Sequence, residues 1–133
     1  MPYLLDTHAF LWFVSADNQL PESARKIIED IHESCFLSAA SLWEITIKYQ
    51  NNKLYLGISL KELFDFADRN QIEIIPINYE HLLQLSKLPA HHNDPFDRLI
   101  IAQAISEELI IVTRDKLFKN YKVRQIWGQT ASS

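Results

Sequence analysis

The stretch YLLDTHAFLW, residues 3–12, joins a short apolar run to a helical segment through one aspartate. Residues 3–5 predict a buried strand, and the residues after Asp6 predict a helix that begins near Thr7. An aspartate at such a junction fits an N-cap, whose carboxylate accepts a hydrogen bond from the first helical turn. Asp6 also follows the carboxyl end of a strand, where open α/β sheets place their functional residues. This stretch alone leaves both roles open.

Strands and helices continue to alternate along the rest of the chain. Further strands are predicted at residues 35–37, 72–77, 109–113 and 123–127. Apolar spacing of i, i+3, i+4 predicts helices at residues 21–32, 41–50, 59–70, 79–88 and 95–108. Ser59 and Glu62 form a capping box at the start of one of these helices. This order predicts an α/β fold in which helices cover a mostly parallel sheet.

Length and composition are those of one globular domain. The chain has 133 residues, of which 47% are apolar, and we expect a single domain over residues 1–127 with a polar tail at 128–133. Cys35 is the only cysteine, so an intrachain disulfide and a cysteine zinc cage are excluded, and a cytoplasmic location is expected. The apolar N-terminus is short and carries Asp6, so we expect neither a signal peptide nor a membrane span.

Charge and glycine content exclude several classes of function. The net charge of −4 argues against a protein that holds nucleic acid by bulk positive charge. If four of the acids bind a metal ion, however, the remainder is neutral, and a nucleic-acid substrate stays compatible with the charge. The two glycines, Gly57 and Gly128, are too few and too far apart for a Walker A loop, a dinucleotide-binding loop or a nucleophile elbow.

Four acids are predicted to meet at one edge of the sheet. Asp6 and Asp115 follow strands. Glu44 lies about two turns into one helix and Asp97 opens another, and the first turns of these helices can lean over the same edge. Each has a simpler reading as well. Asp6 and Asp115 fit helix caps, and Glu44 fits either a surface acid or the N3 partner of Ser41.

The segment HHNDPFDR, residues 91–98, contains a helix start beside one of these acids. Asp94 fits an N-cap, and Pro95 fits the first helical position because its missing N–H would be unpaired there. Asp97 then falls at N3, where a carboxylate interacts favourably with the helix dipole. Carboxylates that gather repel one another and need a cation. Oxygen ligands without cysteine favour Mg²⁺ or Mn²⁺, which predicts metal-assisted hydrolysis of a phosphodiester.

Four segments together carry a resemblance to a known family: YLLDTHAFLW, LSAASLWEITIK, LPAHHNDPFDRLIIAQA and IVTRDKLF. In order and spacing they resemble the acidic motifs of the PIN-domain family, and most closely its VapC-type toxins of type II toxin–antitoxin systems. The resemblance covers residues 2–127. It implies a three-layer α/β/α sandwich, a Mg²⁺- or Mn²⁺-dependent endoribonuclease, an RNA substrate, a cognate antitoxin and a homodimer.

The resemblance also implies roles for individual residues. The catalytic and metal-binding acids would be Asp6, Glu44, Asp97 and Asp115. Thr113 matches a hydroxyl residue that supports the site, and Asp94 keeps the cap. The chain departs from the family at Asn52, where a glycine is usual; asparagine also tolerates left-handed backbone.

Several further residues invite a role. His92, Arg98 and Arg114 neighbour the acids and are candidate RNA contacts, although histidines in a polar loop, such as His91 and His92, are commonly just solvated. Lys48 lies at i+4 from Glu44, which favours a simple ion pair. Trp12, Phe13 and Trp43 are expected in the core, and their density also suits a dimer or antitoxin interface.

Two other functions fit the same acids less well. A non-catalytic PIN-fold module that binds RNA or serves as a scaffold would have little reason to keep a mutually repelling cluster. An aspartate phosphotransfer domain would use Asp6 as the phosphorylated group, but the usual phosphatase pattern has a second aspartate where this chain has His8.

Overall fold

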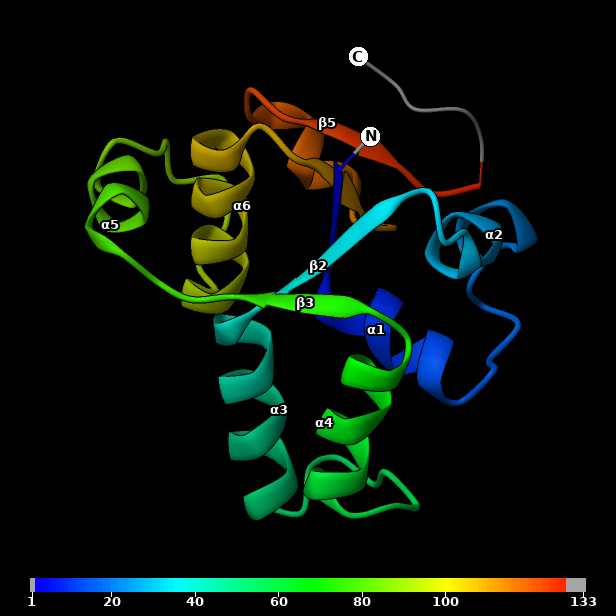
Figure 1. Ribbon diagram of the computed structural model, residues 1–133. Helices are drawn as coiled ribbons and strands as arrows, with labels where there is room; N and C mark the ends of the chain where they lie inside the picture. Colours follow the sequence, from blue (N-terminus) through cyan, green and yellow to red (C-terminus); the bar gives the residue numbers. More distant parts are fainter. Residues whose placement is uncertain (1, 129–133) are drawn as a thin grey trace.

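The structure, a computed structural model, describes residues 2–128, and strands and helices alternate along them (Figure 1). The strands are β1 (Pro2–Leu5), β2 (Ser34–Ser38), β3 (Ile72–Ile75), β4 (Ile110–Val112) and β5 (Arg124–Ile126). The helices are α1 (Thr7–Val14), α2 (Glu22–Glu29), α3 (Ala39–Gln50), α4 (Leu60–Arg69), α5 (Tyr79–Ser86), α6 (Pro95–Glu107) and the 3₁₀ helix η1 (Lys116–Asn120). The predicted polar tail, apart from Gly128, lies outside the described residues. In the described part, no helix combines the length and apolar character needed to cross a membrane.

All five strands form one parallel sheet with the order β3-β2-β1-β4-β5. The chain therefore starts in the middle of the sheet, builds one side with β2 and β3, and then builds the other with β4 and β5. Strand order reverses between β1 and β4, and in such sheets the crevice beyond the carboxyl ends at this switch point is the usual ligand site. We call the carboxyl ends of β1 and β4 the β1–β4 edge. A ligand-binding or catalytic site is expected there.

Each face of the sheet carries its own core, because alternate residues of a strand point to opposite faces. Leu5 and Val112 pack in the first core, which α1, α2, α3 and α4 cover. Leu4 and Ile111 pack in the second, which α6 and η1 cover. The predicted three-layer α/β/α sandwich is confirmed, with a sheet that is wholly parallel.

Local signals set most element ends. The predicted capping box of Ser59 and Glu62 begins α4, and Asn52 adopts left-handed backbone with a φ of 58° after α3. The predicted strand at 72–77 ends at Ile75 instead, because Pro76 has no N–H to offer the sheet.

Two local expectations were wrong. Helix α3 begins earlier than its apolar pattern suggests, capped by Ser38, so Ser41 lies inside the helix and cannot form the N-terminal capping box with Glu44. Trp43 was expected in the core but is 58% exposed, since it points out from α3. Phe13 is buried as expected, and Trp12 is half-buried.

Candidate functional site

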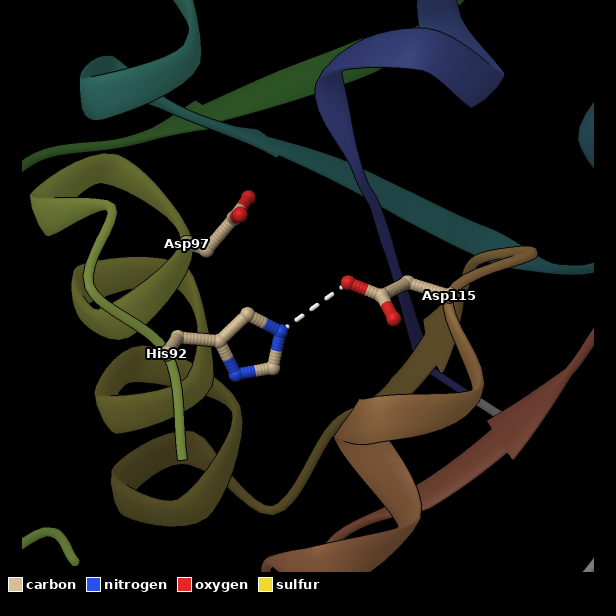
Figure 2. Close-up of side chains that lie close together, drawn as sticks. All are labelled: His92, Asp97 and Asp115. Carbon is tan, nitrogen blue, oxygen red and sulfur yellow. Dashed lines mark hydrogen bonds and ion pairs between the residues drawn. The ribbon is translucent and has the colours of Figure 1, made fainter. Parts of the chain in front are cut away.

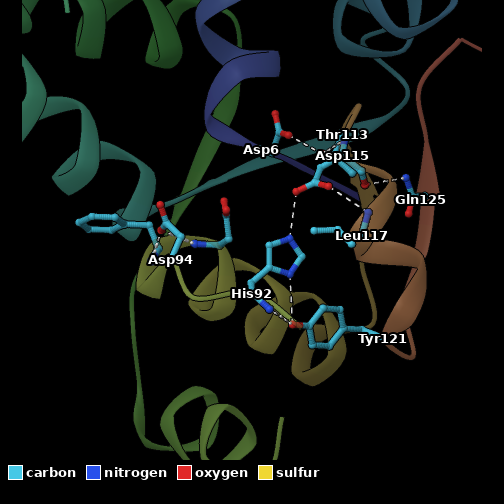
Figure 3. Close-up of polar contacts among 10 residues, drawn as sticks. Asp6, His92, Asp94, Thr113, Asp115, Leu117, Tyr121 and Gln125 are labelled. Carbon is cyan, nitrogen blue, oxygen red and sulfur yellow. Dashed lines mark hydrogen bonds and ion pairs between the residues drawn. The ribbon is translucent and has the colours of Figure 1, made fainter. Parts of the chain in front are cut away.

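The parallel pairing of β1 with β4 brings the first acid beside the fourth. Asp6 directly follows β1, and its backbone N–H donates to the carbonyl of Val112, the last residue of β4, over 3.1 Å. Thr113, fully buried, donates its hydroxyl to Asp6 Oδ2 over 2.5 Å and accepts the backbone N–H of Asp115 over 3.1 Å (Figure 3). One threonine hydroxyl therefore links two of the predicted site acids.

Each of these acids also caps a helix. Asp6 Oδ1 accepts the backbone N–H of Ala9 in α1 over 2.7 Å, and Asp115 Oδ1 accepts that of Leu117 in η1 over 2.9 Å. The capping roles expected from the sequence are confirmed for both. In both carboxylates Oδ1 serves the cap, while Oδ2 faces a side chain of the site.

The start of α6 positions the third acid. Asp94 is the N-cap and accepts the backbone N–H groups of Phe96 and Asp97 over 2.8 and 3.2 Å, with Pro95 at the first helical position. Asp97 lies at N3, as predicted, and its carboxylate faces Asp115. One ligand atom from each of Asp97, Asp115 and His92 lies within 4.8 Å of the others (Figure 2).

Burial and mutual repulsion raise the pKa of two carboxyls in this cluster. The pKa of Asp97 rises to about 7, first because the group is buried and then because Asp94 and Glu44 carry like charge nearby. His92 acts in the opposite direction. Burial also raises the pKa of Asp6, although the hydrogen bonds from Thr113 and the Ala9 N–H act against that rise. Both carboxyls are therefore harder to ionise here than in water, and a positive charge nearby would favour their charged forms.

Glu44 is buried on α3 and held by two neighbours. Its Oε1 accepts the hydroxyl of Thr7 over 2.8 Å, and its Oε2 pairs with Lys48 Nζ over 2.7 Å. The expected i, i+4 ion pair is thus present. Glu44 is coupled to the other acids through its charge, which contributes to the raised pKa of Asp97. The Thr7 hydrogen bond was not predictable from the sequence, because it joins residues from different helices.

His92 is built into the site rather than solvated. It is 7% exposed, and its Nε2 lies 2.9 Å from Asp115 Oδ2. Its Nδ1 and its backbone N lie 3.1 and 3.0 Å from the hydroxyl of Tyr121. The expectation of a solvated pair holds for His91, which is exposed, but not for His92. The cause is the packing of Phe118 and Tyr121 over the loop, which the loop's own sequence does not show.

The two arginines lie on the surface around the acids. Arg98 Nη1 donates to the carbonyl of Pro89 over 3.1 Å. Arg114 is exposed; its guanidinium lies 4.6 Å from the ring centroid of Trp12 and donates to Gln19 Oε1 over 3.2 Å. Arg98 follows Asp97 in the chain and Arg114 precedes Asp115. Both arginines therefore stay candidate phosphate contacts.

A groove of about 650 Å³ opens next to the acids, between α1, α3, α4 and the loop before α4. Thr7 and Lys48 form its end nearest Glu44. Its apolar lining includes Leu11, Trp12, Leu54, Leu56 and Phe66. Lys53 and Arg69 also line it. Glu62 lines it as well, so the groove combines an apolar floor with charges of both signs, of which the positive ones are more numerous.

The donor set fits a divalent cation. Asp97 and Asp115 present carboxylate oxygens, which Mg²⁺ and Mn²⁺ prefer, and Asp6 lies beside them. A cation here would favour the charged form of Asp97, whose pKa is raised first by burial and then by the like charges of Asp94 and Glu44. The arrangement is thus suited to hold a metal ion at the switch point of the sheet.

Comparisons with known proteins agree with this arrangement. The family model described as PIN domain matches residues 3–123. The fold is similar to a chain in the crystal structure of VapBC2 from Rickettsia felis bound to a DNA fragment from their promoter. The TM-score is 0.73 at 19% identity, over 96% of this chain and 99% of that one. No curated protein sequence matches the chain. The family match, together with the acids at the β1–β4 edge, identifies the chain as a member of the PIN domain family.

Proposed function

We propose that the protein is a Mg²⁺- or Mn²⁺-dependent endoribonuclease and the toxin of a VapC-type toxin–antitoxin pair, acting in the cytoplasm. PIN domains are generally nucleases, which supports hydrolysis of nucleic acid. The observation that carries the proposal is the approach of Asp97 to Asp115 within 4.8 Å, with Asp6 tied to Asp115 through Thr113. Such a cluster is unfavourable without a cation and useful with one.

Under this proposal, Asp6, Asp97 and Asp115 hold the cation and Glu44 completes the acidic site. The cation supplies Lewis-acid chemistry, polarising the phosphodiester and promoting attack by water. The Thr113 hydroxyl holds the Asp6 carboxylate beside the backbone of Asp115. Arg98 and Arg114 bind substrate phosphates beside the acids, and RNA is the substrate.

A cleavage assay on the purified chain tests the proposed activity. RNA incubated with the protein and Mg²⁺ or Mn²⁺ is expected to be cut internally, and EDTA is expected to stop the reaction. The variant Asp6→Asn is expected to lose at least about 100-fold in rate, because one charged ligand is removed while the cap geometry is kept. Undiminished cleavage by Asp6→Asn, or cleavage that continues in EDTA, would contradict the proposal. A folded protein that binds RNA and cuts none would favour the non-catalytic module.

The groove beside Glu44 supports an antitoxin partner. An amphipathic segment with apolar anchors and acidic flanks would match its apolar floor and the charges of Lys53 and Arg69. The similar fold comes from a VapBC2 complex, which is consistent with a protein partner.

The outer face of α5 supports a homodimer. Tyr79, Leu82 and Leu83 share one side of the helix, and Tyr79 and Leu83 are 86% and 63% exposed. Leu83→Asp is expected to convert a dimer to a monomer without unfolding it, because the side chain is already exposed. Light scattering after size exclusion checks this result, with Gln50→Asp, at an exposed position on α3, as a control that changes the net charge by the same amount. A dimer that survives Leu83→Asp would place the interface elsewhere.

A further inference from the structure

The acidic site contains a nitrogen donor that the four acids do not account for. His92 Nε2 lies 2.9 Å from Asp115 Oδ2, and it belongs with Asp97 and Asp115 to a group whose ligand atoms are all within 4.8 Å. Two ligands that bind one small cation at about 2.1 Å and at right angles lie about 3 Å apart. The observed separation of Nε2 and Oδ2 is therefore already that of neighbouring ligands.

The protein fixes the orientation of this imidazole from behind. The ring packs edge-on against Phe118, with centroids 4.9 Å apart at 90°. The hydroxyl of Tyr121 lies 3.1 Å from Nδ1 and accepts the backbone N–H of His92 over 3.0 Å. These contacts aim Nε2 at the two carboxylates and leave it little freedom to turn away. Histidines that bind metals are commonly held in this way, with the other ring nitrogen bonded to an oxygen.

We propose that His92 Nε2 is a direct ligand of the divalent cation, together with Asp97 and Asp115, so that the site has mixed nitrogen and oxygen donors. This inference rests on the proposed function and adds one ligand to it. Without the cation, the ring donates Nε2–H to Asp115 Oδ2. As a metal ligand, Nε2 would have released this proton, and the proton on Nδ1 would be donated to the Tyr121 oxygen, which lies 3.1 Å away.

A nitrogen ligand has a consequence for the choice of metal. Imidazole suits first-row transition ions, whereas Mg²⁺ favours carboxylates, carbonyls and water. The ratio of the Mn²⁺ affinity to the Mg²⁺ affinity is therefore expected to be larger at this site than at a site with oxygen ligands alone. Removing the imidazole should reduce this ratio by roughly tenfold. The competing role for His92 is a hydrogen bond that only orients Asp115, and it predicts no nitrogen on the metal.

Pulsed electron paramagnetic resonance of the Mn²⁺-loaded full chain distinguishes the two roles. Wild type is expected to show hyperfine coupling from one directly bound ¹⁴N, and protein labelled with ¹⁵N-histidine should show the ¹⁵N pattern instead. His92→Gln is expected to lose the coupling, whereas His91→Gln, a change at the exposed neighbouring ring, should keep it. Calorimetric titrations with Mn²⁺ and Mg²⁺ give the affinity ratio for the same proteins.

The outcomes separate this inference from the function on which it rests. Wild type that binds Mn²⁺ and cuts RNA but shows no nitrogen coupling would overturn the ligand role and leave the nuclease standing. Coupling that persists in His92→Gln would overturn it as well. A wild type that binds no Mn²⁺ would overturn both. If His92→Gln fails to fold, the isotope experiment on wild type shows whether a histidine binds the metal, and coupling that persists in both His91→Gln and His8→Gln assigns it to His92, because His8 is the other histidine whose charge acts on a site acid.

Discussion

Asp97→Asn is expected to reduce metal-dependent RNA cleavage by at least about 100-fold, while the fold survives. The amide keeps the size of the side chain at N3 of α6 but removes the charge that faces Asp115. The negative charge of Asp97, together with that of the neighbouring acids, is what attracts the cation. Single-turnover cleavage of an RNA substrate at saturating Mn²⁺ measures the loss, and circular dichroism confirms that the variant is folded.

Asp94→Asn is the matched control, since it makes the same change three residues away. Asp94 serves the helix, accepting the N–H groups of Phe96 and Asp97, and asparagine is an equally good N-cap. This variant is expected to cleave RNA within a few-fold of wild type. If Asp94→Asn and Asp97→Asn lose the same amount of cleavage rate, the structure of the α6 start is required rather than the Asp97 charge. If Asp97→Asn keeps its activity, Asp97 does not belong to the site.

The metal-free protein is expected to lose stability as the pH rises from about 4 to about 7, and Asp97→Asn should abolish this part of the loss. The pKa of Asp97 is about 7 in the folded protein against 3.8 for the free side chain. Over this interval the folded state holds a proton that the unfolded state has released, so raising the pH favours unfolding. Below pH 4 both states are protonated and the variant gains little.

Near pH 8 in EDTA, Asp97→Asn should exceed wild type in unfolding free energy by about 1–3 kcal/mol. Urea unfolding at pH 4, 6 and 8 measures the difference. Asp94→Asn removes one of the like charges that raise the pKa of Asp97, so it should lose less stability over this pH range than wild type and more than Asp97→Asn. Added Mn²⁺ should stabilise wild type and not Asp97→Asn, because only the folded wild type binds it. A difference between the proteins that does not change with pH would show that Asp97 ionises normally.

The fold was predictable because its signals are local. Apolar runs marked every strand, and 3.6-residue periodicity marked the helices after the first, with capping residues such as Ser59 and Asp94 near their starts. The predictions were wrong for residues whose neighbours in space come from distant parts of the chain. Trp43 follows an apolar pattern but points away from the sheet, and its edge-on contact is with Phe96 of another helix.

The candidate site was predictable in its outline and not in its contacts. Parallel pairing alone brings the residues after β1 and β4 together, so the positions of Asp6 and Asp115 followed from strand order. The burial of His92 depends on Tyr121, which is 29 residues away, and the loop sequence carries no trace of it. The Thr7 hydroxyl on Glu44 likewise joins two helices whose packing no single segment encodes.

Locating Mn²⁺ in a crystal tests whether the acids at the β1–β4 edge hold a divalent cation. Crystals of the protein equilibrated with Mn²⁺ would be measured for anomalous scattering. We expect an anomalous difference peak in contact with Asp97 and Asp115, beside Asp6. Well-ordered crystals at saturating Mn²⁺ with no peak among these three side chains would contradict it.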